Sequence, residues 1–340
     1  MAVLLMAVLP FSDLRADESV NPGLDAKVWL EKMQQAYRQS NFELFFVKQT
    51  SALSEPVIFS HGVVNDKQYS HWMYLNGIPM GYFTVGDKVV YFKAGERPDV
   101  VKSGRHHFLL GRFNEINLAH LYSNYVPVVT GRNRIAGRNV LAIRLNSKHS
   151  DLYGYMLYLD ETTNVLLQVD VISPDNGMII ECYLATHYIY GDTPNQIIQN
   201  ISEATVPEAD VTGRNDLADS FKGTKRRQSN FSWRLEYIPS GFSLIYSETV
   251  KLTDSDVHAD HLFYSDGLAD FSVYRIKTMD AREFPVVNQG PVNLLRHTYG
   301  DYEVIVVGDL LLKEEEKIAE SYTETDAANV ESQTSGSGDE

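Results

Sequence analysis

The sequence predicts a mainly β protein with a few helices, built from antiparallel strands. Its clearest signal is a meander over residues 152–190. Two turn clusters, Glu161–Asn164 and Pro174–Gly177, separate three runs rich in β-branched and aromatic residues. The middle run, Val165–Ser173, alternates along the chain but keeps large apolar residues on both faces. We therefore expect a sheet that is either covered on both faces or curved around a cavity.

The segments before the meander predict the same class. Apolar residues recur at helical spacing over Leu24–Ser40, and a strand over Phe42–Gln49 follows. Further short strands come next, separated by Asn65-Asp66 and similar hairpin pairs. Such regular hairpins favour a barrel or sandwich built as an up-and-down meander. We then predict a loop over Ala94–Arg105 and a short helix over Phe113–Tyr125.

The sequence predicts two domains joined by a linker. The larger domain is expected to span residues 24–201, and the polar stretch 202–230, which has no hydrophobic period, is typical of a linker. Residues 231–322 contain short strands with turns and end in a helix, which indicates a smaller α+β domain. The tail over residues 323–340 is rich in Thr, Ser, Gly and acidic residues, so we expect it to be disordered.

The charge balance narrows the kinds of partner. The chain carries a net charge of -15, and the stretch after Ile318 is acidic without any Lys or Arg. Nucleic acid is not expected as a partner, because phosphate binding needs clustered cations. The single cysteine, Cys182, excludes an intrachain disulfide and a cysteine-based zinc site, and no nearby cation would activate its thiol.

Residues 1–16 are interpreted as the remnant of a signal peptide. Ala2–Phe11 is an apolar run about as long as the core of a secretory signal and too short to span a bilayer as a helix. A basic segment does not precede it, and Leu14-Arg15-Ala16 is a weak cleavage site. The alternative is a buried core helix. We expect an exported, periplasmic protein.

The sequence contains no motif that predicts catalysis. It has neither a phosphate-binding glycine loop nor a nucleophile elbow, so we expect no enzyme and no cofactor. The pair His106-His107 is interpreted as part of a loop. One group combines several metal-ligand types, but we interpret it as a solvated acidic loop rather than a metal site, because neighbours in a strand face opposite ways. Its members are Asp254, Asp256, His258, Asp260 and His261.

The larger domain carries many aromatic residues on neighbouring strands. The chain holds 20 Tyr and 15 Phe but 3 Trp, and tyrosine suits walls that are apolar inside with a polar rim. If the sheet curls incompletely, Met and aromatic side chains would line a hollow suited to acyl chains. The alternative is an ordinary filled core. The predicted lipid-binding wall consists of Tyr74, Met80, Tyr82, Tyr153, Tyr155 and Tyr158.

Three stretches of the chain closely resemble the RseB/MucB family, periplasmic negative regulators of the sigma-E (AlgU-type) envelope stress response. They are the meander segment Tyr158–Glu181, the segment Trp233–Phe242 ending in Ile-Pro-Ser-Gly-Phe, and Leu262–Val273 with its Leu-Phe-Tyr-Ser-Asp-Gly-Leu. The occurrence of the last two segments one after the other in the chain is specific for this family. The resemblance runs from about Leu24 to Ser321 and so covers both predicted domains.

The resemblance implies a larger domain shaped as an unclosed antiparallel β-barrel, similar to the lipoprotein carriers of the outer-membrane sorting pathway. It also implies a smaller antiparallel α+β domain. Family members bind the periplasmic part of a membrane anti-sigma factor and protect it from regulated proteolysis, and lipid or lipopolysaccharide releases them. The alternatives are a lipid carrier without a regulatory role and a hydrolase with an unrecognised site. A homo-oligomer is left open.

We expect the smaller domain and the surface between the domains to hold the anti-sigma partner. In the alternative interpretation, Asp266-Gly267 only forms a turn while the apolar residues on either side pack the small core. The predicted partner-binding residues share one hairpin and are Phe263, Tyr264, Asp266 and Leu268.

Overall fold

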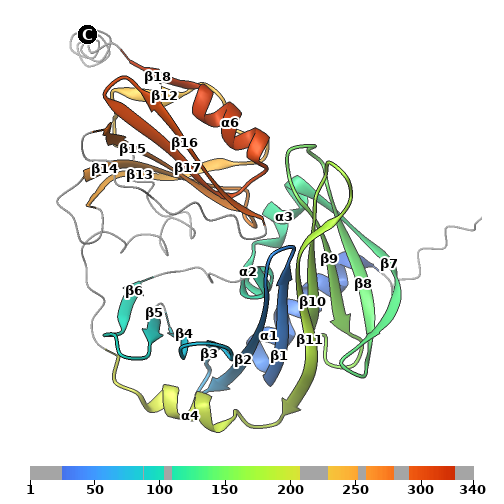
Figure 1. The fold of residues 1–340 in the computed structure, drawn as a ribbon. Coiled ribbons are helices and arrows are strands. Elements are labelled where there is room, and N and C mark those ends of the chain that lie inside the picture. Colours follow the sequence, from blue (N-terminus) through green and yellow to red (C-terminus); the bar gives the residue numbers. More distant parts are fainter. Residues whose placement is uncertain are drawn as a thin grey trace, which may run out of the picture.

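The protein consists of a large and a small unit, each built on an antiparallel sheet (Figure 1). This arrangement confirms the predicted fold class. No helix in the described parts of the chain is long and apolar enough to cross a membrane. Residues 1–16, His106-His107, Asp254 and Asp256 lie outside the described residues. The computed structural model describes residues 25–86, 88–102, 109–206, 229–251, 258–278 and 291–325.

The large unit contains an eleven-stranded sheet in the order β6-β5-β4-β3-β2-β1-β11-β10-β9-β8-β7. Because β1 pairs with both β2 and β11, it joins two meanders that extend in opposite directions. Among the described residues, the end strands β6 and β7 do not pair with each other, so the sheet stays open. The strands are β1 (Asn41–Thr50), β2 (Ser54–Val64), β3 (Lys67–Tyr74), β4 (Met80–Val85), β5 (Lys88–Lys93), β6 (Asp99–Lys102), β7 (Tyr125–Ile135), β8 (Arg138–Ser147), β9 (Gly154–Asp160), β10 (Leu166–Ile172) and β11 (Ile179–Gly191).

Hairpin turns lie where the sequence predicts them. Asn65 and Asp66, between β2 and β3, both have positive φ angles, 50° and 62°, as a tight hairpin turn requires. Gly177, between β10 and β11, has a φ of 69°. These residue types tolerate the left-handed backbone, so each turn forms with little strain and fixes the register of its two strands.

Helices lie on both faces of the large sheet. On the inner face, α1 (Ala26–Gln39) and α2 (Leu109–Glu115) pack near β1, β2 and β10. Asp25 caps α1 by accepting a hydrogen bond from the Lys27 backbone N–H, which fixes where this predicted helix begins. On the outer face, α4 (Gln196–Glu203) packs its apolar side against Tyr69 of β3.

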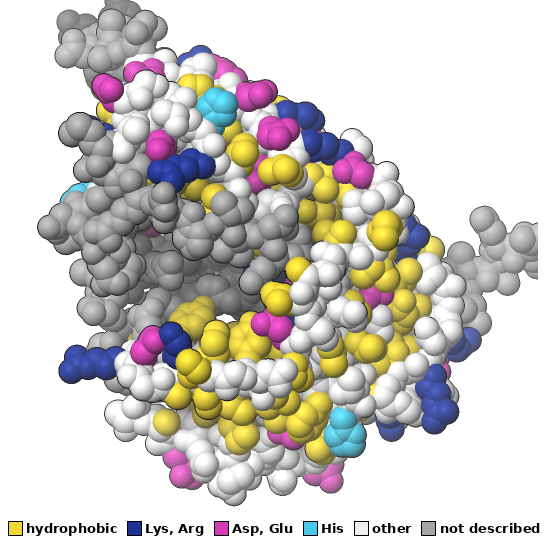
Figure 2. Space-filling view, in the orientation of Figure 1, with side chains coloured by type: hydrophobic (Ala, Val, Ile, Leu, Met, Phe, Trp, Pro, Cys, Tyr) yellow, Lys and Arg dark blue, Asp and Glu magenta, His cyan; other side chains and the backbone are white. Residues whose placement is uncertain are grey.

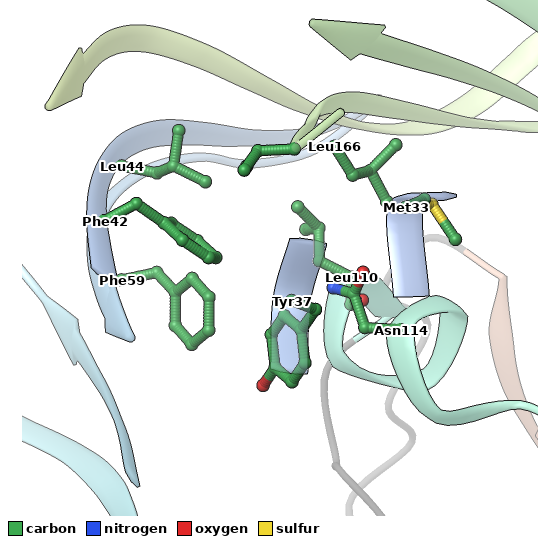
Figure 3. A pocket seen from close by; sticks show the side chains of 9 residues that line it. Met33, Tyr37, Phe42, Leu44, Phe59, Leu110, Asn114 and Leu166 are labelled. Atoms are coloured by element: carbon green, nitrogen blue, oxygen red, sulfur yellow. The ribbon is translucent and has the colours of Figure 1, made fainter. Parts of the chain in front are cut away.

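The middle of the inner face is a filled core. Leu30 and Met33 of α1, and Leu110 and Phe113 of α2, are each at most 1% exposed. The void left between the two helices and the sheet measures only about 10 Å³ (Figure 3). In this part of the domain, the structure therefore follows the alternative interpretation of an ordinary packed core.

The region between β5 and β7 differs from the prediction. Residues 113–125, expected as one helix, hold the end of α2, a break and then α3 (Leu118–Asn124). The break occurs because the Asn117 side chain accepts a hydrogen bond from the His120 N–H and so starts a new helix. The loop expected over residues 94–105 contains β6, a short edge strand paired with β5. Four residues are too few to show a period in the sequence.

The small unit is a five-stranded sheet in the order β13-β14-β15-β17-β16, with a separate pair formed by β12 and β18. Val273, Val304 and Val306 are 0% exposed and form its centre, and α6 packs on β16 and β17. β18 extends the unit into the first residues of the predicted tail. The elements are β12 (Trp233–Leu235), β13 (Ser243–Lys251), β14 (His258–Ser265), β15 (Asp270–Lys277), β16 (Val292–Tyr299), β17 (Tyr302–Asp309), α6 (Leu312–Glu320) and β18 (Tyr322–Glu324).

The described members of the predicted metal-type group have other partners. Asp260 Oδ2 accepts a hydrogen bond from the Trp233 indole at 2.9 Å, and His261 Nε2 lies 3.0 Å from Ser272 Oγ. Within the described ranges, no group of three or more His, Cys, Asp or Glu residues is arranged to hold a metal ion. His258, Asp260 and His261 lie on β14 rather than in the solvated loop that the sequence predicted, and His261 is buried at 6% exposure.

Candidate functional site

The end of the large sheet formed by β3, β4 and β5 holds a hollow of about 430 Å³. This volume falls within the usual range of small-molecule sites, about 300–1,000 Å³. Figure 2 shows hydrophobic side chains gathered over this part of the molecule. We call it the aromatic hollow, and its lining residues are Lys48, Trp72, Tyr74, Met80, Gly81, Tyr82, Tyr91, Phe92, Lys93, Glu96, Arg97 and Tyr183.

Packed aromatic rings form the wall of the aromatic hollow. The ring centroid of Trp72 lies 6.4 Å from that of Tyr82, with the planes inclined by 9°, and 6.4 Å from that of Tyr74, nearly edge-on. Tyr91 extends the row, 5.7 Å from Tyr82. Burial raises the pKa of Tyr82 well above its usual value, so its hydroxyl stays neutral. Met80, 41% exposed, adds a side chain that adapts its shape to a guest.

Charged side chains lie at both edges of the aromatic hollow. At the outer edge, Lys93 forms an ion pair with Glu96 beside Arg97. At the inner edge, the Lys48 ammonium of β1 lies 3.5 Å from Glu181 Oε1 of β11. The lining thus carries more cations than acids, although the chain as a whole has a net charge of -15. An apolar wall with a cationic rim suits an amphiphile better than a fully apolar guest.

The structure brings together half of the predicted wall. Tyr155 lies away from the aromatic hollow and packs edge-on against Phe113 of α2, with ring centroids 5.4 Å apart. Tyr158 lies on the opposite face of β9 from Tyr155, because strand residues alternate between faces. Tyr153 lies at the contact between the units. The predicted wall residues that line the aromatic hollow are Tyr74, Met80 and Tyr82.

The two units contact each other through buried polar groups around α2. Arg112 Nη1 lies 2.5 Å from Asp309 Oδ2 and donates to the carbonyl oxygen of Leu268 at 3.2 Å. Burial alone would lower the pKa of the Arg112 guanidinium, but the nearby Asp309 carboxylate raises it above its usual value. The Tyr153 hydroxyl donates to the Leu310 carbonyl oxygen at 2.9 Å. We call this region the domain junction.

Asp266, at the turn between β14 and β15, is a central part of the domain junction. Its Oδ1 accepts hydrogen bonds from the Leu268 and Ala269 N–H groups at 2.7 and 2.6 Å, and its Oδ2 accepts one from the Tyr125 hydroxyl at 3.1 Å. Its carbonyl oxygen accepts a hydrogen bond from the Asn124 amide at 3.1 Å. The residue is 0% exposed, and burial raises its pKa above the usual value.

The hairpin predicted as a partner surface is therefore largely used within the molecule. Asp266 and Leu268 are 0% exposed, and Tyr264 is buried with its ring stacked 4.8 Å from Phe271. Phe263 is partly exposed. The structure supports the alternative interpretation for most of this hairpin, with the addition that its turn docks on the large unit. A partner could contact Asp266 only if the two units separated.

A second hollow of about 180 Å³, which we call the junction hollow, lies between the units. Lys48 and Tyr183 line both hollows. Its charged residues were not predicted from the sequence, although Lys48 and Glu181 each interrupt an apolar strand, which was an available signal. The lining residues are Lys48, Leu109, Arg112, Tyr155, Val171, Glu181, Tyr183, Pro291, Val292 and Asp309.

Glu181 is the buried carboxylate between the two hollows. Burial raises its pKa to about 7, although the Lys48 ammonium acts in the opposite direction, and the negative charge of Asp309 adds to the rise. The Tyr183 hydroxyl donates to Glu181 Oε1 at 3.4 Å. The charge state of Glu181 therefore depends on whether Lys48 stays beside this carboxylate.

The open sheet with its aromatic hollow, docked through buried polar groups on a smaller sheet, defines a two-domain binding protein. Models of two protein domains match the chain: the MucB/RseB N-terminal domain over residues 25–209 and the MucB/RseB C-terminal domain over residues 227–323. The chain belongs to the MucB/RseB family. This result confirms the resemblance found in the sequence.

Relatives with known names match along most of the chain. The sigma-E factor regulatory protein RseB of Haemophilus influenzae is 25% identical over 299 residues, which cover 87% of this chain and 90% of that protein. The sigma factor AlgU regulatory protein MucB of Pseudomonas aeruginosa is 24% identical, with coverage of 87% and 90%. The solved Pseudomonas aeruginosa MucA/MucB complex contains a chain with the same fold, with a TM-score of 0.66, 22% identity and coverage of 89% and 100%.

Proposed function

We propose that this protein is a periplasmic regulator that binds the periplasmic region of a membrane anti-sigma factor. By shielding that factor from proteolysis, it restrains a sigma-E-type envelope stress response. The observation that carries the proposal is the family match over both domains, together with relatives named as sigma factor regulatory proteins. A MucB has also been solved in complex with the periplasmic part of MucA.

The geometry of the domain junction supports a binding role rather than catalysis. Asp266 is buried, Arg112 and Asp309 are half-buried, and all three are paired across the junction, so they hold the two units in one arrangement. A partner that contacts both units would bind this arrangement of the units and would bind less tightly when the units separate. The proposed regulator needs no catalytic group, and these charged residues have structural partners.

The aromatic hollow is proposed to accept an acyl chain of a lipid or of lipopolysaccharide, and its occupation weakens partner binding. A ligand shifts such an equilibrium only through its different affinity for the two arrangements. Reversing a 99:1 equilibrium needs about 5.5 kcal/mol of preference. Burial of methylene groups contributes about 0.8 kcal/mol each, so roughly seven methylenes suffice if they are buried in one arrangement alone.

The test uses the purified protein and the periplasmic segment of an anti-sigma factor of the MucA type. The segment is mixed with its initiating protease, with and without the protein, and cleavage is followed over time. The proposal predicts that the protein slows cleavage and that lipopolysaccharide restores it. An unchanged cleavage rate at a saturating protein concentration would contradict the regulatory role.

The second candidate is a lipid carrier without a regulatory role, which the aromatic hollow alone would support. A carrier has no need of the small unit, which contacts the large unit through several polar groups. A pull-down from envelope extract separates the candidates, since a regulator recovers the anti-sigma factor and a carrier recovers lipid or lipoprotein only.

A further inference from the structure

The aromatic hollow and the junction hollow share a wall. Lys48 and Tyr183 line both of them, and Glu181 lies on the junction side of that wall. Lys48 is held there by two acids, at 3.5 Å from Glu181 and 4.0 Å from Glu55, and its side chain is 17% exposed. Of the two side chains that line both hollows, Lys48 is the charged one, so a change in its ion pairs on one side of this wall reaches the other side.

Charged groups of alternating sign continue from this wall to the small unit. Lys48 pairs with Glu181, and both line the junction hollow together with Arg112 and Asp309. Arg112 pairs with Asp309 and also donates to the Leu268 carbonyl oxygen, so it fixes two elements of the small unit. The negative charge of Asp309 also acts on Glu181, so the charges of the two units influence each other.

We infer that the Lys48–Glu181 pair couples the aromatic hollow to the domain junction, so that an occupant of the hollow which binds the Lys48 ammonium loosens the two units. This inference rests on the proposed function and assigns the residues that regulate it. Lys48 and Glu181 act through Arg112 and Asp309, so they are positioning residues rather than contacts of the anti-sigma partner.

The coupling follows from the cost of an unpaired buried charge. When an oxygen of the occupant binds the Lys48 ammonium, Glu181 loses its cation while it stays buried near Asp309. The Glu181 carboxylate then either takes up a proton or attracts Arg112, the other cation among the described residues that line the junction hollow. Attraction of Arg112 weakens its contacts with Asp309 and Leu268, which hold the small unit in place.

The test compares four proteins: wild type, Lys48→Met, the neutral pair Lys48→Met with Glu181→Gln, and the control Lys67→Met. The double variant removes both charges of the buried pair and so protects against misfolding, since Glu55, the other acid beside Lys48, has a side chain that is 35% exposed. Lys67 is exposed and lines neither hollow. Affinity for the anti-sigma segment is measured with and without lipopolysaccharide, and lipopolysaccharide binding is measured separately. We expect about a tenfold loss of affinity on adding lipopolysaccharide to wild type and Lys67→Met. In the double variant, adding lipopolysaccharide should change the affinity for the anti-sigma segment by less than about threefold, although lipopolysaccharide still binds.

The outcomes separate the coupling from the proposed function. If lipopolysaccharide weakens partner binding equally in wild type and in the double variant, the coupling is wrong and the regulatory function stands. If lipopolysaccharide does not bind the wild type, the lipid part of the proposed function fails, and a measurement without ligand decides the coupling.

That measurement is a double-mutant cycle on thermal unfolding with Lys48→Met and Asp309→Asn. Coupled residues give shifts in unfolding midpoint that differ from additivity by about 2 °C or more. The matched cycle with Lys67→Met and Asp309→Asn should be additive. Additivity in both cycles would overturn the inference, and non-additivity in the first cycle alone would support it.

Discussion

The middle of the large sheet and its β3–β5 region have the same kind of inward-facing residues but different interiors. In the middle of the sheet, Phe42 and Phe59 pack against α1 and α2 around a void of about 10 Å³. At the end formed by β3 to β5, Trp72 and Tyr82 line a hollow of about 430 Å³. The strands are aromatic in both places. The position of the two helices, rather than the composition of the strands, therefore decides which region is core and which can bind a guest.

The largest expected effect tests the filled region. Phe113→Ala removes a ring that is 0% exposed and packed against Tyr155, so it should lower the free energy of unfolding by about 3–5 kcal/mol. The matched change Tyr91→Ala in the aromatic hollow removes a partly exposed ring and should cost about 1 kcal/mol. Urea denaturation measures both. Equal losses of unfolding free energy in the two variants would show that the two regions are packed alike.

The next effect tests the contact between the units. Arg112→Met leaves the half-buried Asp309 carboxylate without its cation and should destabilise the protein by about 3 kcal/mol. It should also make the protein more sensitive to limited proteolysis. The control Arg144→Met removes an exposed arginine of β8 and should cost less than about 0.5 kcal/mol. If both variants resist proteolysis like the wild type, the buried pair does not hold the units together.

A third effect tests the buried acids beside the aromatic hollow and in α6. Burial raises the pKa of Glu181 from 4.5 to about 7, so between these values the folded protein keeps a proton that the unfolded chain has lost. The free energy of unfolding should therefore fall as pH rises through this window, by about 1.4 kcal/mol per pH unit from this group. Burial raises the pKa of Glu315 to about 8, so its contribution continues to that pH.

Glu181→Gln should make the unfolding free energy depend less steeply on pH below pH 7. The pH dependence that comes from Glu315 should remain. Glu315 is 0% exposed, and neither of its carboxylate oxygens has a hydrogen-bond partner among the described residues, so Glu315→Gln should remove the rest. Denaturation curves at several pH values give both slopes. A slope that both substitutions leave unchanged would mean that these pKa values are not raised.

The smallest effect on stability belongs to the hollow itself. Met80→Ala removes a side chain that is 41% exposed and should change the free energy of unfolding by less than about 1 kcal/mol. It should nevertheless weaken lipopolysaccharide binding severalfold, because the flexible thioether covers part of the wall. The control Met178→Ala, at a 63% exposed residue that does not line the aromatic hollow, should leave that binding unchanged. Equal binding by both variants would place the guest elsewhere.

The sequence predicted the elements better than their arrangement. Hairpin pairs such as Asn65-Asp66 and the alternation of β10 carry local information, so the meander could be found from the chain alone. The family resemblance covered both domains and was confirmed. Local patterns could not show that α1 and α2 cover the middle of the sheet, so Tyr153 and Tyr155 could not be distinguished from Tyr82.

The ion pairs beside the two hollows could not be predicted from local sequence patterns either. Lys48 and Glu181 are visible in the sequence as charges within apolar strands, but their pairing depends on β1 lying next to β11, which are far apart along the chain. The pairing of Arg112 with Asp309 depends on how the small unit docks. Partners that are distant in sequence were therefore the part that sequence reasoning missed.

The most direct test of the account is whether an acyl chain enters the aromatic hollow. Trp72 lines this hollow, whereas the two other tryptophans, Trp29 and Trp233, do not. A fatty acid brominated along its chain is titrated into the wild type and into Trp72→Phe, and tryptophan fluorescence is recorded. The account predicts saturable quenching in the wild type that Trp72→Phe largely abolishes. Equal quenching in both proteins, or none in the wild type, would contradict it.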